Sequence, residues 1–154
     1  MEVQTILWPT DLSKNSVKAA KNVESLAETY KAKVILLYVG VDIMSHFGAY
    51  GEPSKEHVSH FQKFEMDHAR KKLESVCQKE LKACPALEVR LVQGDPATEI
   101  IKAIKKEKAD MVVITTHGRG AEEVDQVSAE FGSVAKKVIT NSPVPVHLVN
   151  PLRK

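Results

Sequence analysis

The sequence predicts an α/β protein in which a five-stranded, mostly parallel sheet is covered by helices on both faces. Short β-branched runs alternate with amphipathic helical patterns along all 154 residues, and such alternation is typical of βαβ units. The apolar run Met111–Ile114 ends abruptly at Thr115, where a polar glycine-containing loop leads to Gly132 and Ser133. A strand followed by such a loop and a helix start marks the carboxyl edge of a parallel sheet, where these folds bind ligands.

Composition predicts one domain spanning residues 1–154 and excludes several classes of partner. Lys and Arg number 22 against 20 Asp and Glu, and aromatic residues make up only 5%, so neither nucleic acid nor an anionic membrane is indicated. Cys77 and Cys84 lie seven residues apart, outside the C-x-x-C spacing, and we expect two reduced, partly buried thiols. No leader pattern and no apolar run long enough to span a bilayer is present, which predicts a cytoplasmic protein.

The first βαβ unit occupies residues 3–39. Val3–Trp8 and Lys33–Val39 are short apolar runs and predict two parallel strands. Between them, Asp11 or Ser13 can cap a helix, because a short side-chain oxygen accepts hydrogen bonds from the first helical turn. That helix presents apolar residues three or four positions apart: Val17, Ala20, Val23, Ala27 and Tyr30.

The middle of the chain predicts a loop and a long helix. Glycine and proline interrupt Gly40–Pro53, which we interpret as a polar and aromatic loop. A helix is expected from Ser54 to about Leu81, with charged residues on its solvated side. Its expected inner side consists of Val58, Phe61, Met66, Ala69, Leu73, Val76 and Cys77.

The remaining elements complete the alternation. Glu88–Val92 predicts a third strand, and Pro96 stands in the first turn of the next helix, where a missing N–H does no harm. Ala109–Ile114 predicts the fourth strand and Val144–Val149 the last. Pro145 cannot donate to a strand ladder, which favours an edge position. The two intervening helices bury Ile100, Ile101 and Ile104 in one case and Val134, Val138 and Ile139 in the other.

Four residues fall at carboxyl ends of strands or in adjoining loops, namely Asp11, Val39, Thr115 and Gly132. A carboxylate at Asp11 can accept hydrogen bonds from adenine or ribose, or it can cap the first helix. Likewise Gly118, Gly132 and Ser133 can approach a phosphate, or they can form a tight turn and a helix start. Neither G-x-x-x-x-G-K-[ST] nor G-x-G-x-x-G is present, so no P-loop or dinucleotide site is predicted.

Other titratable residues favour structural interpretations. His57 and His60 share a helix face without a third ligand nearby in sequence, which favours a solvated face over a metal site. His117 can hold a phosphate or hydrogen-bond within the turn. Four acidic residues between 119 and 131 are expected to be solvated: Glu122, Glu123, Asp125 and Glu130. If they faced a phosphate, they would repel it unless a divalent cation lay between them.

Five segments together resemble the universal stress protein family over nearly the whole chain. They are QTILWPTDLSKNS, KVILLYV, GDPATEII, ADMVVITTHGR and GSVAKKVITNSPVPVHLV. The resemblance implies a doubly wound, Rossmann-like sheet of the adenine-nucleotide alpha hydrolase type, with strand order 3-2-1-4-5. It also implies a homodimer joined through Val144–Val149.

ATP-binding members of that family carry G-x2-G-x9-G-[ST] after the fourth strand. Gly118 matches the second glycine, and Gly132 with Ser133 matches the last pair, whereas Thr115 replaces the first glycine. Thirteen residues, 119–131, stand where the pattern has nine. The resemblance thus implies a nucleotide pocket altered at its phosphate end, for ATP or AMP with Mg²⁺ accompanying the nucleotide.

Each pocket residue has an implied position. Asp11 and the backbone of Val39 would hold base and ribose, and Pro9 and Thr10 would shape the same pocket. The phosphates would contact Gly118, Gly132, Ser133 and Val134.

The leading functional hypothesis is a stress-response sensor or regulator that signals through the order of 119–131 or Gly40–Pro53 when nucleotide binds. One alternative is a homodimer that binds no nucleotide and works through protein contacts, motivated by Thr115 and the longer acidic loop. A third is slow ATP hydrolysis or adenylyl transfer. No general base or nucleophile is identifiable, so we expect a binding protein rather than an enzyme.

Overall fold

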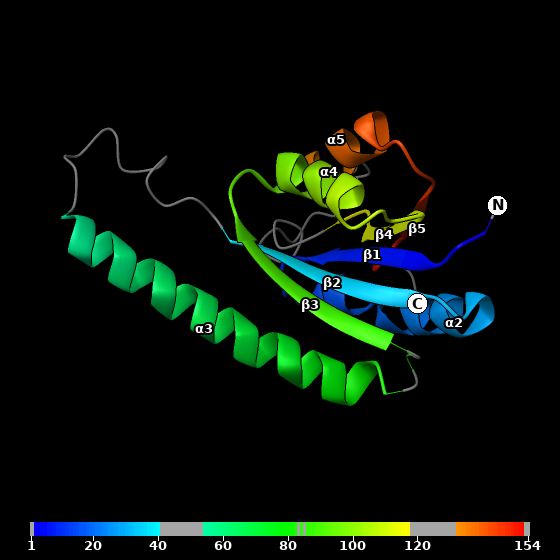
Figure 1. Cartoon of the computed structure of the whole chain (residues 1–154), viewed down its shortest axis with the longest axis horizontal. Coiled ribbons are helices and arrows are strands. Elements are labelled where there is room, and N and C mark those ends of the chain that lie inside the picture. Colours follow the sequence, from blue (N-terminus) through cyan, green and yellow to red (C-terminus); the bar gives the residue numbers. More distant parts are fainter. Residues whose placement is uncertain (1, 41–53, 83, 85, 118–131, 153–154) are drawn as a thin grey trace.

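Five parallel strands form a single sheet with the order β3-β2-β1-β4-β5 in the computed structural model (Figure 1). The structure describes residues 2–40, 54–82, 84, 86–117 and 132–152. Every neighbouring pair of strands is parallel, and the predicted fold and strand order are confirmed. The strands are β1 (Thr5–Thr10), β2 (Lys33–Gly40), β3 (Ala86–Gln93), β4 (Met111–Thr115) and β5 (Val146–Val149).

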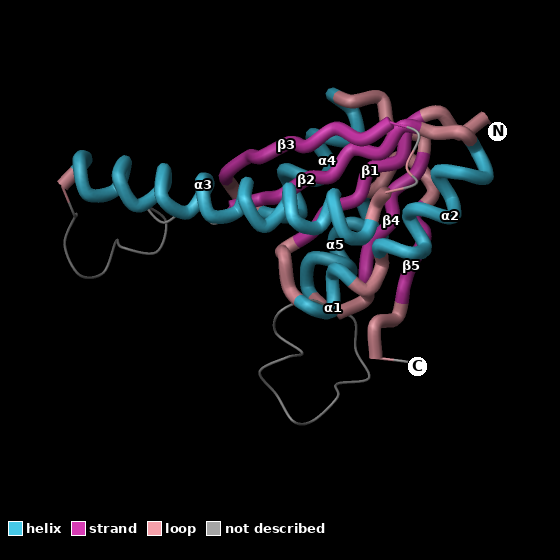
Figure 2. Tube along the Cα trace, turned by 90° about the horizontal axis from the view of Figure 1, so that it is seen from below, coloured by secondary structure: helices cyan, strands magenta, loops and turns pink. Residues whose placement is uncertain are grey.

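Helices cover both faces of the sheet. One layer contains α2 and α3 and the other contains α4 and α5, while α1 lies at the carboxyl end of β1 (Figures 1 and 2). None of the described helices combines the length and apolarity needed to cross a bilayer. The helices are α1 (Lys14–Val17), α2 (Ala20–Tyr30), α3 (Lys55–Glu80), α4 (Pro96–Lys106) and α5 (Ser133–Asn141).

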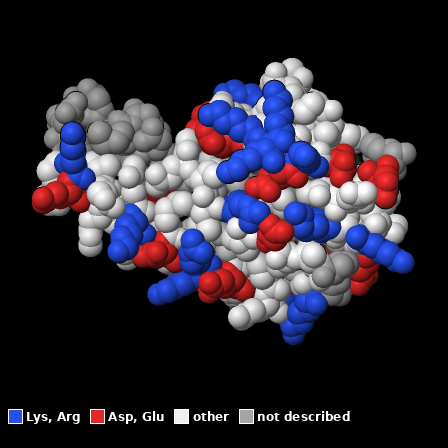
Figure 3. Space-filling model, viewed as in Figure 1, with Lys and Arg blue, Asp and Glu red and all other residues white. Residues whose placement is uncertain are grey.

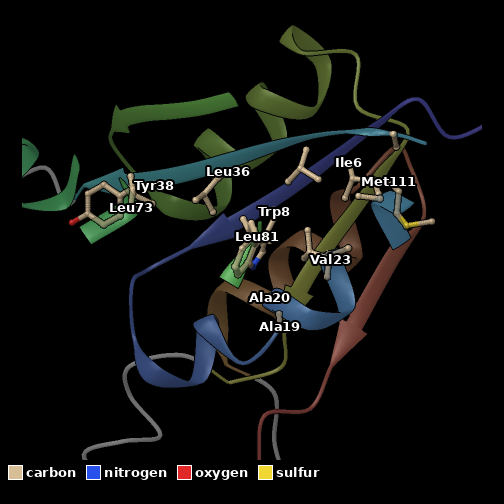
Figure 4. Close-up of a cluster of buried hydrophobic side chains, with 14 of the residues drawn as sticks. Ile6, Trp8, Ala19, Ala20, Val23, Leu36, Tyr38, Leu73, Leu81 and Met111 are labelled. Carbon is tan, nitrogen blue, oxygen red and sulfur yellow. The ribbon is translucent and has the colours of Figure 1, made fainter. Parts of the chain in front are cut away.

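Two apolar cores form because successive side chains of a strand point to opposite faces. In β1, Ile6 and Trp8 join the core beneath α2 and α3, whereas Leu7 joins the core beneath α4 and α5. Figure 4 shows the first of these cores, with Trp8 against Leu81 at the end of α3. The central strands are buried on both faces, which is why they appear in the sequence as continuous apolar runs.

The first predicted helix is divided in two. After α1 the backbone N–H groups of Lys18 and Ala19 donate to the carbonyls of Asn15 and Ser16, each at 3.2 Å. These bonds span three residues instead of four and tighten the turn before α2 begins. The division lets the short polar side chains of α1 face the end of β1 while α2 packs its apolar side on the sheet.

Three residues predicted on the apolar faces of helices are exposed. Phe61 is 56% exposed, and Tyr30 at the end of α2 and Ile139 on α5 are exposed as well. The 26 residues of α3 extend over about 39 Å, whereas the eight-residue strands β2 and β3 extend over about 27 Å. The amino-terminal part of α3 therefore projects beyond the sheet (Figures 1 and 2), and some of its surface touches neither core formed by the described residues.

Gly94 forms the turn after β3, and the last strand lies at the predicted edge of the sheet. Gly94 has φ of 148°, a conformation that side chains rarely adopt, and its N–H donates to the carbonyl of Gly40 at 3.1 Å. Pro145 precedes β5, which occupies the sheet edge, and its carbonyl accepts from the N–H of Val112 at 3.0 Å. Cys77 and Cys84 are free, partly buried thiols, as predicted.

Candidate functional site

Buried polar side chains gather at the carboxyl ends of β1 and β4 and in the first turn of α1. These two strands are neighbours, and the chain continues from β1 toward one edge of the sheet and from β4 toward the other. Ligands of open α/β sheets bind at such a switch point. The buried polar residues in the described part of the chain are Thr10, Ser13, Asn15, Ser16, Thr115, Thr116 and His117.

At the end of β1, side chains hold the loop into α1. The Thr10 hydroxyl oxygen accepts from the Leu12 N–H at 3.0 Å and from the Ser16 hydroxyl at 2.7 Å. Leu12 has φ of 63°, a left-handed conformation that these bonds support. The Ser13 N–H donates to Asp11 Oδ1 at 2.9 Å, while Ser13 Oγ caps the helix by accepting from the Ser16 N–H at 3.1 Å. Ser13 is thus the capping residue, and the half-buried Asp11 shapes the turn before it.

At the end of β4, backbone and side-chain bonds fix the start of the next loop. Thr116 donates its N–H to the carbonyl of Val149 at 3.0 Å. Its hydroxyl lies 2.8 Å from His117 Nδ1, so the imidazole is held by its own neighbour. His117 is only 8% exposed and is the last described residue before Gly118. Thr115 is equally buried, and its β-carbon occupies the strand end where a glycine would leave the backbone open.

The amino terminus of α5 lies beside these residues. Gly132 donates its N–H to the carbonyl of Thr116 at 2.8 Å. The Gly132 N-cap position supplies no side-chain cap, and the first turn contains no acidic residue. Ser133 is exposed and Val134 half-buried. Helix amino termini carry partial positive charge and orient N–H groups outward, so this one can accept an anion.

Packing against the described residues does not require glycine at position 132. A β-carbon there would meet the Thr116 carbonyl oxygen at 3.5 Å, an ordinary contact, and φ is −58°, which any residue adopts. At Gly94, in contrast, a β-carbon would lie 2.9 Å from Glu99 Cγ. The absence of a side chain at Gly132 is therefore unexplained by local packing.

Besides β1 and β4, the strand β2 also ends at this edge of the sheet and contributes backbone groups to it. Pro9 is buried and pairs in register with Leu37, and Thr10 pairs with Tyr38. Val39, half-buried, follows at the end of β2. These positions, together with Asp11, Thr115, His117, Gly132, Ser133 and Val134, come together at one edge of the sheet. Gly118 and the acidic residues between 122 and 130 lie outside the described residues.

Sequence reasoning missed three members of the buried polar group, Asn15, Ser16 and Thr116. The available signal was the density of short polar residues at positions 13, 15 and 16, where an amphipathic helix would place apolar ones. For the described ranges, no set of three or more His, Cys, Asp or Glu side chains has the geometry of a metal site.

Comparison with known proteins agrees with this arrangement. The sequence model of the universal stress protein family (Usp) matches residues 2–150. The chain belongs to the universal stress protein family. Universal stress protein MJ0531 of Methanocaldococcus jannaschii is 34% identical over 150 residues, which cover 97% of this chain and 83% of that protein.

Solved structures of the family have the same fold. Protein MJ0577 of Methanocaldococcus jannaschii superposes with a TM-score of 0.81 at 27% identity, covering 100% of this chain and 99% of that one. A universal stress protein from Archaeoglobus fulgidus, solved in complex with dAMP, has a TM-score of 0.65 at 18% identity, with 97% and 100% covered.

Proposed function

We propose that this universal stress protein is a stress-response regulator of the cytoplasm that binds an adenine nucleotide between the ends of β1 and β4. The observation that carries the proposal is the placement of the α5 amino terminus beside buried polar residues at the sheet's switch point. An anion-accepting helix end and a polar strand edge are the two parts that a nucleotide requires.

The proposed contacts follow the geometry. Asp11 and the backbone of Val39 face base and ribose, with Pro9 and Thr10 forming the adjoining wall. Gly132, Ser133 and Val134 face the phosphates together with Gly118. The missing side chain at Gly132, which packing does not explain, would let a phosphate approach the helix backbone. An adenine nucleotide is also the ligand in the Archaeoglobus fulgidus complex.

The phosphate end of the proposed pocket is altered by Thr115. Its buried β-branched side chain replaces the open backbone that a glycine would give. We expect this substitution to disfavour the longer phosphate chain, so that AMP binds at least as tightly as ATP. Mg²⁺ would accompany ATP and ADP by neutralising their phosphates.

The proposal includes a homodimer through β5. Among the strands that the structure describes, β5 pairs with β4 alone, and Leu148 is 38% exposed. An unpaired strand edge is a template for a second copy, and a two-fold axis would pair it with itself. Sedimentation of a Leu148→Lys variant tests this part separately, since a smaller mass than the wild type is expected.

Calorimetric titration with ATP, ADP and AMP, each with and without Mg²⁺, tests nucleotide binding. We expect micromolar binding that Asp11→Ala and Ser133→Ala weaken at least tenfold. Asp95→Ala is the matched control, because Asp95 makes the same kind of local hydrogen bond, to the Thr98 N–H at 3.0 Å, at the end of β3. Equal binding by all four proteins, or none by the wild type, would contradict the proposal.

A second candidate, a dimer that acts through protein contacts without nucleotide, is favoured by one observation. The polar groups of the site already bond to one another, with Ser16 on Thr10 and Thr116 beside His117, so their burial is compensated without a ligand. Restoring the family pattern, by Thr115→Gly and removal of four residues from 119–131, distinguishes the two. Nucleotide binding gained only by the restored protein would favour the protein-contact candidate.

A further inference from the structure

The amino-terminal part of α3 carries an aromatic seam on its exposed surface. The seam, defined as His57, Phe61, Phe64 and His68, follows steps of four, three and four residues and so forms one straight stripe. All four side chains are exposed, and the two phenylalanines are 56% and 65% exposed. Phe64 stacks on His68, with ring centroids 6.3 Å apart and planes inclined by 8°.

The seam is separate from the part of α3 that packs on the sheet. Ala69 and Leu73 are buried in the core beneath α2 and α3, and they lie on another side of the helix. Val58 is also buried but belongs to neither core. The amino-terminal part of α3 extends beyond β2 and β3 (Figures 1 and 2). Phe64 and His68 lie level with the end of β2, where Glu65 accepts from the Tyr38 hydroxyl at 3.1 Å, but on an exposed side of the helix that another helix can approach. Figure 3 shows both Lys or Arg and Asp or Glu along the visible face of α3, with neither sign alone.

We propose that the aromatic seam pairs with the same seam of a second copy of this chain, with the two α3 helices antiparallel. A two-fold axis between Phe61 and Phe64 brings Phe61 of each copy against Phe64 of the other. His57 of each copy then meets His68 of the other. A surface that is complementary to itself in this way is the requirement for a two-fold interface.

The charges beside the seam favour the antiparallel direction. His60 and Asp67 flank it on the same side, seven residues apart, and both are exposed. In the antiparallel pair the His60 imidazole of each copy faces the Asp67 carboxylate of the other, which gives two complementary hydrogen-bonded contacts. In a parallel pair the two-fold axis would place this flank of the two copies on opposite sides of the pair, so His60 and Asp67 of different copies would not meet.

The expected association is weak. Four phenylalanine side chains would together lose on the order of 500 Å² of exposed surface, and the histidines would add less. The total stays below the roughly 1,000 Å² of a stable interface. The pairing should therefore be reversible and depend on protein concentration. It uses the β3 side of the molecule, away from β5.

Sedimentation equilibrium of the full chain over a wide concentration range tests the seam. We expect Phe61→Glu/Phe64→Glu to raise the dissociation constant of the association through α3 at least tenfold. Ser59→Glu/Lys63→Gln is the matched control, since it lowers the charge by the same amount on another exposed side of the same part of α3. Unchanged association of the double glutamate variant, or an equal loss in the control, would overturn the proposal.

Cross-linking tests the direction. In a Cys77→Ala/Cys84→Ala background, chains with Phe61→Cys and chains with Phe64→Cys should form disulfides with each other when mixed. Each should form few with itself. Disulfides formed mainly within each variant alone would indicate parallel pairing and overturn the antiparallel arrangement. If the seam instead packs against residues 41–53 of its own chain, neither disulfide forms and the mass stays constant, which also overturns it.

Discussion

The backbone N–H of Gly132 lies 2.8 Å from the carbonyl oxygen of Thr116, and this bond holds the start of α5 against the end of β4. Helix and strand belong to parts of the chain separated by the residues between 117 and 132. Because the bond uses only backbone atoms, it fixes the helix end without placing a side chain over it. The amino terminus of α5 is thereby held beside the end of β4.

Replacing Gly132 with alanine should separate ligand binding from folding. Alanine is a poorer N-cap than glycine but restricts the unfolded chain, so we expect a net change within about 0.5 kcal/mol in the free energy of unfolding. Nucleotide affinity should fall at least tenfold because the methyl group obstructs the phosphates. Urea unfolding and calorimetry measure the two effects.

Gly94→Ala is the control for that substitution. The positive φ and the 2.9 Å approach of Glu99 Cγ should cost on the order of 1–3 kcal/mol. An equal loss of stability in the Gly132→Ala and Gly94→Ala proteins would show that Gly132 has a structural role after all.

The Thr10 hydroxyl should matter more for stability than its partner Ser16. Thr10→Val removes the acceptor of two hydrogen bonds, from the Leu12 N–H and the Ser16 hydroxyl. Both donors then lose their partner while they stay in the protein interior. Such losses cost about 1–3 kcal/mol per buried group. Ser16→Ala leaves Thr10 still bonded to Leu12 and should cost about 1 kcal/mol.

A double-mutant cycle in urea gives the coupling between Thr10 and Ser16. Because the two residues share one buried hydrogen bond, the double variant should lose less unfolding free energy than the two single variants lose in sum. Additive losses would contradict a direct bond between the two hydroxyls.

The sequence predicts the sheet well because burial on both faces leaves a direct signal. The stretches Ile6–Trp8, Val34–Val39 and Met111–Ile114 contain apolar residues only, and glycine or proline closes nearly every strand. Strand limits differ by a few residues, as for β3, which begins at Ala86 instead of Glu88. The residues of β3 are exposed or only half-buried, so the apolar pattern in the sequence is shorter than the hydrogen-bonded strand.

Two kinds of feature could not be predicted from the sequence: those that depend on the length of a helix relative to the sheet, and those that depend on partners distant in the chain. Phe61 continues the apolar periodicity of α3, and only the end of the sheet beside it determines that it is exposed. The site residues Asp11, Thr115 and Gly132 follow from their places at strand ends. The polar residues at positions 13, 15 and 16 do not identify Thr10 as the partner of Ser16, because that bond depends on the turn at Leu12.

Asp95 should stabilise α4 in a pH-dependent way. Its carboxylate accepts from the Thr98 hydroxyl and N–H, at 2.7 and 3.0 Å, and these bonds lower the pKa of Asp95. A lowered pKa means that the stabilisation is present at neutral pH and is lost as the pH falls through the folded-state value.

Asp95→Ala should therefore cost about 1 kcal/mol at neutral pH and less in acid. Urea unfolding at several pH values measures this change. Asp95→Asn is the control, because an amide oxygen can still accept the bond but does not titrate. A stability difference between Asp95→Ala and wild type that stays constant down to strongly acidic pH would contradict the assignment.

The two thiols should be poorly reactive while the protein is folded. Burial is the main cause that raises the pKa of Cys84 to about 11, with Glu24, Cys77 and Glu28 adding to it through their charges. Burial likewise raises the pKa of Cys77. Since the thiolate is the nucleophile, alkylation by iodoacetamide near neutral pH should be slow and should accelerate steeply toward pH 11.

The same shift makes stability depend on alkaline pH. A thiol whose pKa is higher in the folded than in the unfolded state contributes stability that is present below the unfolded value, near 9. This contribution is lost as the pH rises toward 11. Cys84→Ser should weaken this alkaline loss, which urea unfolding between pH 8 and 11 measures. Alkylation of the folded protein as fast as that of the urea-unfolded chain would contradict the burial of both thiols.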